Sequence, residues 1–170
     1  MALIGRLHPL LVHFPIALVM VAAAFEAAAM VTKDELWRTA AVVNVRAAAA
    51  FGLLLLMGYA LSWVGVVIGL SVRAPEAAAT SNFLWLFPLT FLSNAFVAPS
   101  TLPTVLRWAA EWNPLSATVQ ATRQLFGNPG LAATGAWPAQ HPVLVSLSWS
   151  VLIAVVGRTL AVRRYRAAGT

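Results

Sequence analysis

Long apolar stretches without charge dominate the pattern of hydrophobic and polar positions along the chain. A helix needs about 20 predominantly apolar residues to cross the hydrocarbon core of a bilayer, and four stretches qualify as spans. We expect all four to be helices, because open strands leave backbone groups without hydrogen-bond partners in lipid. The predicted spans cover residues 7–31, 47–72, roughly 82–98 and roughly 142–162.

Between the last two spans the pattern changes to that of two short amphipathic helices. Residues 103–112 place apolar side chains on one face, and residues 114–126 follow Asn113 as an N-cap and stop before Gly127. Each of these helices is too short to cross a bilayer. The two form either a re-entrant pair that dips into the membrane or a lid at its outer interface, and the sequence leaves both arrangements open.

The composition agrees with a membrane protein. Of the 170 residues, 61% are hydrophobic and only 9% are charged, and the mean hydropathy is +0.82. Soluble domains contain about 25% charged residues, so this chain lies far outside their range. The predicted fold is therefore all-α: a polytopic membrane protein with about four transmembrane helices and two short extracellular or re-entrant helices between the last two spans.

The residues that are missing or dispersed argue against several kinds of site. The chain has no cysteine, which excludes disulfides and thiolate metal sites. It lacks the Gly-rich turn ending in Gly-Lys-Ser/Thr that binds ATP phosphates. The five acidic residues are dispersed, and the net charge of +6 forms no basic face for nucleic acid. We expect no catalytic residues, no metal site and no nucleic-acid partner.

Basic residues predict the orientation in the membrane. Residues 163–170 form a basic tail, and the connector 73–82 carries Arg73. Because cytoplasmic loops are enriched in lysine and arginine, we expect both segments in the cytoplasm. Four crossings then place the N-terminus in the cytoplasm as well, and the membrane is expected to be the bacterial cell (inner) membrane.

Residues from about 49 to 166 resemble the C-terminal half of an ABC-2-type transporter permease. The subgroup they resemble most is that of the daunorubicin/doxorubicin-resistance and multidrug exporter permeases. The phrases that carry the resemblance stand in the family's order: "GYALSWVGVVIGLSVRAPEAA" (58–78), "FPLTFLSNAFVAPSTLP" (87–103), "WNPLSATVQATRQLF" (112–126) and "HPVLVSLSWSVLIAVVGRTLAVRRYR" (141–166).

This resemblance implies a function and a set of partners. In the family these segments are the fourth, fifth and sixth transmembrane helices of a six-helix domain, with two short external helices before the sixth. Such permeases pair with a second permease chain and bind a cytoplasmic ABC ATPase subunit, which holds the ATP. They export drugs, lipids or glycans. The resemblance implies a permease-like exporter subunit that carries no cofactor of its own.

The third predicted span carries the candidates for substrate contact. Thr90, Ser93 and Asn94 recur at i, i+3 and i+4, which is one face of a helix. Small polar residues of this kind either line a substrate path or form hydrogen bonds between packed helices, and both roles stay open. Pro88 is expected to loosen the helix locally and to belong to its packing surface.

Two further sets of residues are candidates for packing and for partner contact. Gly65 and Gly69 form a Gly-x-x-x-Gly pair, which allows two helices to approach closely. Arg73 and Glu76 lie in the connector that is expected in the cytoplasm. They contact the ATPase subunit or simply keep the turn solvated.

The first 45 residues are expected to have a different origin. The phrase "RLHPLLVHFPIALVMVAAAFEAAAM" (6–30) resembles predicted bacterial membrane proteins of unknown function that begin with His-Pro-Leu-Leu-Val-His-Phe-Pro. Residues 46–170 would then be a partial ABC-2-type permease domain, without the first half of the family's domain. We expect the chain to be truncated or fused.

A second hypothesis follows from the histidines of that first segment. His8 and His13 are five residues apart, so on a regular helix they diverge by about 140°. They are weak candidates for a haem site, because imidazoles in or beside lipid often serve haem or protons. The alternative functions are therefore a small membrane protein that binds haem or a redox partner, and a fusion remnant without function.

Overall fold

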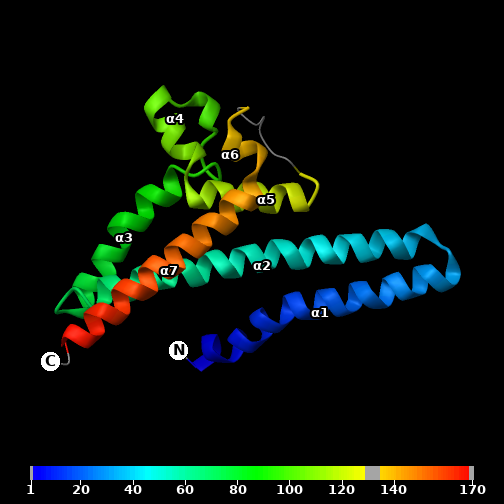
Figure 1. Cartoon of the computed structure of the whole chain (residues 1–170), viewed down its shortest axis with the longest axis horizontal. Helices are drawn as coiled ribbons and strands as arrows, with labels where there is room; N and C mark the ends of the chain where they lie inside the picture. Colours follow the sequence, from blue (N-terminus) through cyan, green and yellow to red (C-terminus); the bar gives the residue numbers. More distant parts are fainter. Residues whose placement is uncertain (1, 129–134, 169–170) are drawn as a thin grey trace. The chain divides into compact units, whose positions relative to one another are not determined.

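The computed structural model is helical (Figure 1) and describes the backbone of residues 2–128 and 135–168, with side chains from residue 13 onward. No strand occurs in those ranges, so the all-α prediction is confirmed. The helices are α1 (Ala2–Thr32), α2 (Glu35–Gly69), α3 (Pro75–Phe91), the 3-10 turn η1 (Pro99–Thr101), α4 (Thr104–Glu111), α5 (Pro114–Leu125), α6 (Trp137–Gln140) and α7 (Pro142–Ala168).

Within the described residues, three helices are long and apolar enough to cross a membrane: α1 from His13 to Thr32, α2 and α7. Most of their side chains are exposed within the chain, which is expected where lipid covers a helix. The chain is a multi-pass membrane protein. Helix α3 has 17 residues, which is short of the about 20 that cross an undisturbed hydrocarbon core. A fourth crossing therefore stays a prediction.

Contacts divide the chain into two compact units. The first contains residues 1–55 and 122–128, and the second contains residues 56–121 and 129–170. Helix α2 begins in the first unit and ends in the second. The predicted boundary after residue 45 concerned the origin of the two segments, and it stays a prediction.

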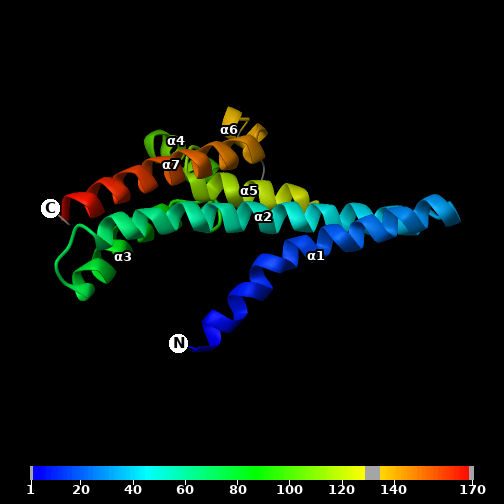
Figure 2. The same ribbon diagram turned by 60° about the horizontal axis from the view of Figure 1, so that its bottom comes forward.

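In the first unit, α1 and the beginning of α2 form a helical hairpin (Figures 1 and 2). Lys33 adopts a positive φ of 57°, which reverses the chain direction. The Asp34 carboxylate then accepts a hydrogen bond from the Leu36 N–H at 2.9 Å and caps α2. Because of this cap α2 begins at Glu35, twelve residues before the predicted start of the second span at residue 47.

Aromatic rings and small residues hold this hairpin together. Phe14 meets Phe51 edge to face with ring centroids 4.8 Å apart, and Phe25 packs on Trp37 at 5.4 Å. Four alanines that recur every seven residues are buried and are small enough to allow the two backbones to approach: Ala22 and Ala29 of α1, and Ala41 and Ala48 of α2. This pattern agrees with helix pairing in membranes, where small residues form the contact.

In the second unit, α7 and the end of α2 run in the same direction (Figures 1 and 2). The contacts recur along both helices: Ser150 Oγ lies 4.0 Å from Met57 Sδ, Gly157 lies against Trp63, and Arg164 hydrogen-bonds Ser71. A Cβ at Gly157 would lie 2.8 Å from the Trp63 Cβ, so a glycine is required at this crossing. The sequence patterns did not single out this position.

The predicted packing glycines lie in less crowded places. A Cβ at Gly65 would meet Asn82 of α3 at an ordinary 3.7 Å, and a Cβ at Gly69 would meet no described atom within 4 Å. The packing role of these two glycines stays a prediction.

The boundaries of α3 differ from those of the predicted third span. The helix runs from Pro75 to Phe91, whereas the span was placed at roughly 82–98. Pro75 is preorganised for a first helical position, which explains the early start. At the other end the Ser93 hydroxyl donates to the Thr90 carbonyl at 2.6 Å, and the chain turns instead of continuing the helix.

The two short amphipathic helices form where the sequence predicted them. Helix α4 covers Thr104–Glu111 and α5 covers Pro114–Leu125. The Asn113 side chain accepts from the Leu115 N–H at 2.8 Å and thus caps α5, and Gly127 follows the helix with a φ of 71°.

A matched pair of glycine substitutions tests the crossing of α2 and α7. We expect Gly157→Ala to lower stability by about 1–3 kcal/mol, because the new methyl group clashes with Trp63. Gly69→Ala should leave the stability unchanged or raise it slightly, since its Cβ meets no described atom and alanine favours helix. Thermal unfolding midpoints in detergent measure both effects. Equal losses in the two variants would contradict the crossing.

Candidate functional site

Buried polar side chains of the described part of the chain gather in the second unit. This is unusual in so apolar a chain, because a buried polar group costs free energy unless it is hydrogen-bonded. The buried set consists of Ser93, Asn113, Ser116, Thr118, Gln120, Ser146 and Ser150. We use the name polar cluster for Asn94, Ser116, Thr118, Gln120 and Ser146, which join the turn after α3 to α5 and α7.

Helix α5 supplies three members of the polar cluster because it is buried on more than one side. Ser116, Thr118 and Gln120 are all less than 9% exposed. The helix is fixed at its start by Asn113, whose side-chain N–H donates to the Leu89 carbonyl of α3 at 2.7 Å. One asparagine therefore caps α5 and ties it to the end of α3.

Asn94 connects the turn after α3 to α5 through two hydrogen bonds. Its backbone N–H donates to Ser116 Oγ at 3.0 Å, and its side-chain Nδ2 donates to Gln120 Oε1 at 3.4 Å. Ser116 and Gln120 are four residues apart, so they lie on the same face of α5.

Thr118 connects α5 to α7. Its hydroxyl oxygen lies 2.8 Å from Ser146 Oγ, and both side chains are almost completely buried. The Thr118 hydroxyl also donates to the Pro114 carbonyl at 2.9 Å. A hydroxyl has one proton, so Ser146 is the donor in the bond between the helices.

The structure separates the three residues that were predicted to share a helix face. Helix α3 ends at Phe91, so Ser93 and Asn94 lie in the following turn and the expected i, i+3, i+4 face does not form. Thr90 donates to the Leu86 carbonyl at 2.7 Å, and Ser93 donates to the Thr90 carbonyl. Both are held by backbone groups of their own segment, whereas Asn94 is hydrogen-bonded to another helix, α5.

The other predicted residues lie away from the polar cluster. Pro88 stands in the last turn of α3, where its carbonyl accepts from the Leu92 N–H at 3.0 Å. Arg73 and Glu76 are exposed around the start of α3. Their exposure agrees both with a solvated turn and with a contact to a partner.

The sequence contained one usable signal for the residues that it missed. A serine hydroxyl within an apolar span is costly to leave without a hydrogen bond. Ser146 and Ser150 of α7 therefore indicated that this helix packs against other polar or polarisable side chains of the protein. The partners themselves depend on how α5 and α7 meet, and no local pattern gives that.

The two histidines of the predicted haem site, His8 and His13, lie in α1, outside the polar cluster. The side chain of His8 lies outside the described residues, and His13 is exposed on α1. Among the side chains that the structure describes, no three of His, Cys, Asp or Glu gather closely enough to hold a metal ion. A haem role for His8 and His13 stays a prediction.

The chemistry of the polar cluster is that of neutral hydrogen bonding. Its five side chains are hydroxyls and amides, which donate and accept hydrogen bonds and do not titrate near neutral pH. The arrangement is suited to holding helices together or to contacting a polar group of a bound molecule.

A row of aromatic rings lies beside these helices in the second unit. Trp108 of α4, Trp112 at the C-cap of α4, Trp137 of α6 and His141 follow one another with ring centroids 6.4, 6.2 and 4.9 Å apart. All three tryptophans are exposed. Exposed indoles are typical of the interface between lipid and water.

The sequence matches known transport proteins. The profile of the family "ABC-2 type transporter" matches residues 9–126, which is more than half of the chain. The daunorubicin resistance ABC transporter permease protein DrrB1 of Streptomyces coeruleorubidus is 31% identical over 113 residues, which are 66% of this chain and 37% of that relative. The chain thus spans well under half of that protein, and no solved structure matches it.

The match extends the resemblance toward the N-terminus. It begins at residue 9 and therefore includes most of the segment for which a different origin was predicted, without testing that origin. The resemblance to a permease is confirmed, and this chain belongs to the ABC-2 type transporter family.

Proposed function

We propose that the chain is a permease-like subunit of an ABC-2-type exporter. The observation that carries this proposal is the family match over residues 9–126, which includes α2, α3 and the polar cluster residues of α5. ATP binding and hydrolysis are assigned to a separate cytoplasmic ABC ATPase subunit, so this chain needs no cofactor. A second permease chain completes the pathway.

The proposed substrate is a drug-like molecule. The relative is a daunorubicin resistance permease by name, and the chain shares 31% identity with it. Lipids and glycans are the other candidate classes, and a transport panel distinguishes them.

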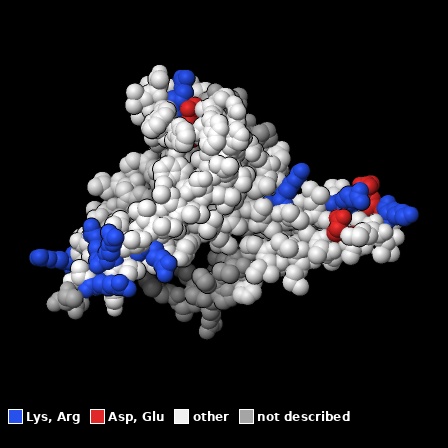
Figure 3. All heavy atoms as spheres, in the orientation of Figure 1, with Lys and Arg blue, Asp and Glu red and all other residues white. Residues whose placement is uncertain are grey.

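The proposed membrane is the bacterial inner membrane, with both termini in the cytoplasm. Basic side chains gather where α7 ends, and the surface in view between that end and α4 carries no charge (Figure 3). The connector before α3 lies at the same end, because Ser71 accepts a hydrogen bond from Arg164. The aromatic row marks the other interface. The distribution of arginine supports a cytoplasmic location of the α7 end.

Asn94 is the proposed contact for substrate. It is partly exposed, whereas Ser146 is completely buried and joins α5 to α7. Thr90 and Ser93 remain candidates for the same path, although their hydroxyls bind their own backbone.

A pair of substitutions separates substrate contact from assembly. With the partner ATPase present, we expect Asn94→Leu to change relative resistance or efflux across a drug panel at least threefold after normalisation to the amount of folded protein. Ser146→Val is the control: it should lower the amount of folded protein by removing the bond to Thr118, at a cost of about 1–3 kcal/mol. Quantitative immunoblots provide the normalisation. A uniform loss for every drug in Asn94→Leu would assign Asn94 to packing.

Purification of the tagged chain from its native membranes tests the exporter proposal itself. We expect an ABC ATPase subunit to be recovered with it, identified by mass spectrometry. Arg73→Gln should reduce that recovery, and Lys33→Gln, which removes a charge at the α1–α2 turn, should leave it unchanged. Recovery of the chain without any ATPase would contradict the proposed motor. Equal recovery with Arg73→Gln would exclude only the Arg73 contact.

A further inference from the structure

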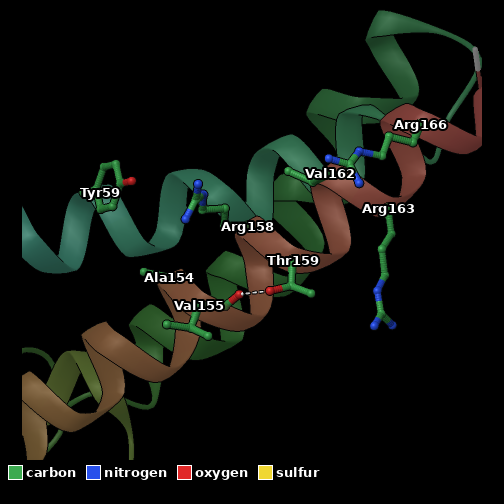
Figure 4. A pocket seen from close by; sticks show the side chains of 8 residues that line it. All are labelled: Tyr59, Ala154, Val155, Arg158, Thr159, Val162, Arg163 and Arg166. Atoms are coloured by element: carbon green, nitrogen blue, oxygen red, sulfur yellow. Dashed lines mark hydrogen bonds between the residues drawn. The ribbon is translucent and has the colours of Figure 1, made fainter.

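A groove with basic side chains lies along α7 and the end of α2, away from the polar cluster. Its volume is about 520 Å³, and it is open to the surroundings (Figure 4). Tyr59 of α2 lines it together with residues of α7: Ala154, Val155, Arg158, Thr159, Val162, Arg163 and Arg166. We call this the basic groove.

The basic groove combines an apolar wall with cations. Val155, Arg158, Val162 and Arg166 follow one another at spacings of three or four residues, so they form one stripe along α7. In Figure 4 Arg158 and Arg166 extend toward the same side, with Val162 between them, whereas Arg163 points away. An occupant must therefore present both hydrocarbon and negative charge.

Within the part of the chain that the structure describes, the charges of the basic groove are not neutralised. Arg158 and Arg166 form no ion pair and no side-chain hydrogen bond there, and none of the described carboxylates lines the groove. The neighbouring Arg164 differs, because it binds Ser71. A guanidinium at a membrane interface attracts an anion strongly, and phosphate matches its planar donors.

We propose that the basic groove binds the headgroup of an anionic phospholipid, with its phosphate between Arg158 and Arg166. The acyl chain lies along Ala154 and Val155. Tyr59, which is 54% exposed, lines the same groove beyond Arg158, on the side away from Arg166 (Figure 4). The Thr159 hydroxyl donates its proton to the Val155 carbonyl at 2.7 Å, so toward a bound lipid it can only accept a hydrogen bond.

The groove lies along a helix that is long and apolar enough to cross a membrane, and this location favours a lipid over an acidic protein segment as the occupant. Helix α7 is one of the apolar helices of the described chain, and valines alternate with the arginines along the stripe. A protein partner in water offers no hydrocarbon for that wall. The inference uses the membrane location in the proposed function, and it does not depend on export or on an ATPase.

Lipid retention by the purified full chain tests the proposal. The chain is placed in phosphatidylcholine nanodiscs with increasing phosphatidylglycerol, and the lipids bound after extraction are counted by native mass spectrometry. We expect Arg158→Gln and Arg166→Gln each to weaken phosphatidylglycerol retention about fivefold. Arg164→Gln is the matched control on the same helix and should stay within twofold of the parent chain, because Arg164 does not line the groove and its side chain binds Ser71.

Three outcomes would overturn the proposal. Equal losses in Arg164→Gln and Arg166→Gln would show diffuse attraction to the membrane surface. Unchanged retention in both Arg158→Gln and Arg166→Gln would show that the groove is not the site. Loss of a co-purifying acidic protein with unchanged lipid retention would assign the groove to that partner. If Arg158→Gln fails to fold, Arg166→Gln near the end of α7 carries the same expectation.

Discussion

The structure depends on one constraint: polar groups that are taken out of water must find their partners inside the chain. The junction of α3 and α5 meets this constraint with few residues. Asn113 caps α5 through its carbonyl oxygen and holds the end of α3 through its amide nitrogen. Asn94 adds its own backbone and side-chain bonds to α5. The short helix α5 can therefore be buried although its surface is polar.

The same constraint explains why α7 is built from small residues on one side. Ser146, Ser150, Gly157 and Ala161 are its buried small residues, and each lets a neighbouring backbone or side chain approach. The hydroxyls of the two serines are hydrogen-bonded or in contact with sulfur, and Gly157 contributes only space. The large apolar side chains of α7 remain on the outside, where lipid replaces water as their surroundings.

The sequence predicted those elements whose signals are local. Apolar length predicted the spans formed by α1, α2 and α7, and the cap at Asn113 with Gly127 predicted α5 to within one residue. It misplaced α3 because the chain turns after Phe91, where the Ser93 hydroxyl binds the Thr90 carbonyl, and an apolar run does not reveal such a turn. It placed the start of α2 too late because polar residues after Asp34 suggested a loop, although they form the first turns of a capped helix. The contacts of Asn94 and Gly157 depend on which helices meet, so residue patterns could not give them.

In the second unit the neutral polar cluster and the arginines of the α7 end lie apart. This separation affects how much free energy a rearrangement costs at each place. The polar cluster offers hydroxyls and amides, whose hydrogen bonds can be exchanged for those of another molecule without moving charge into lipid. The arginines gather at the end of α7, where the free energy of keeping them hydrated or paired with phosphate opposes any movement of that end across the bilayer. Rearrangement in this unit is therefore cheaper at the polar cluster than at the α7 end.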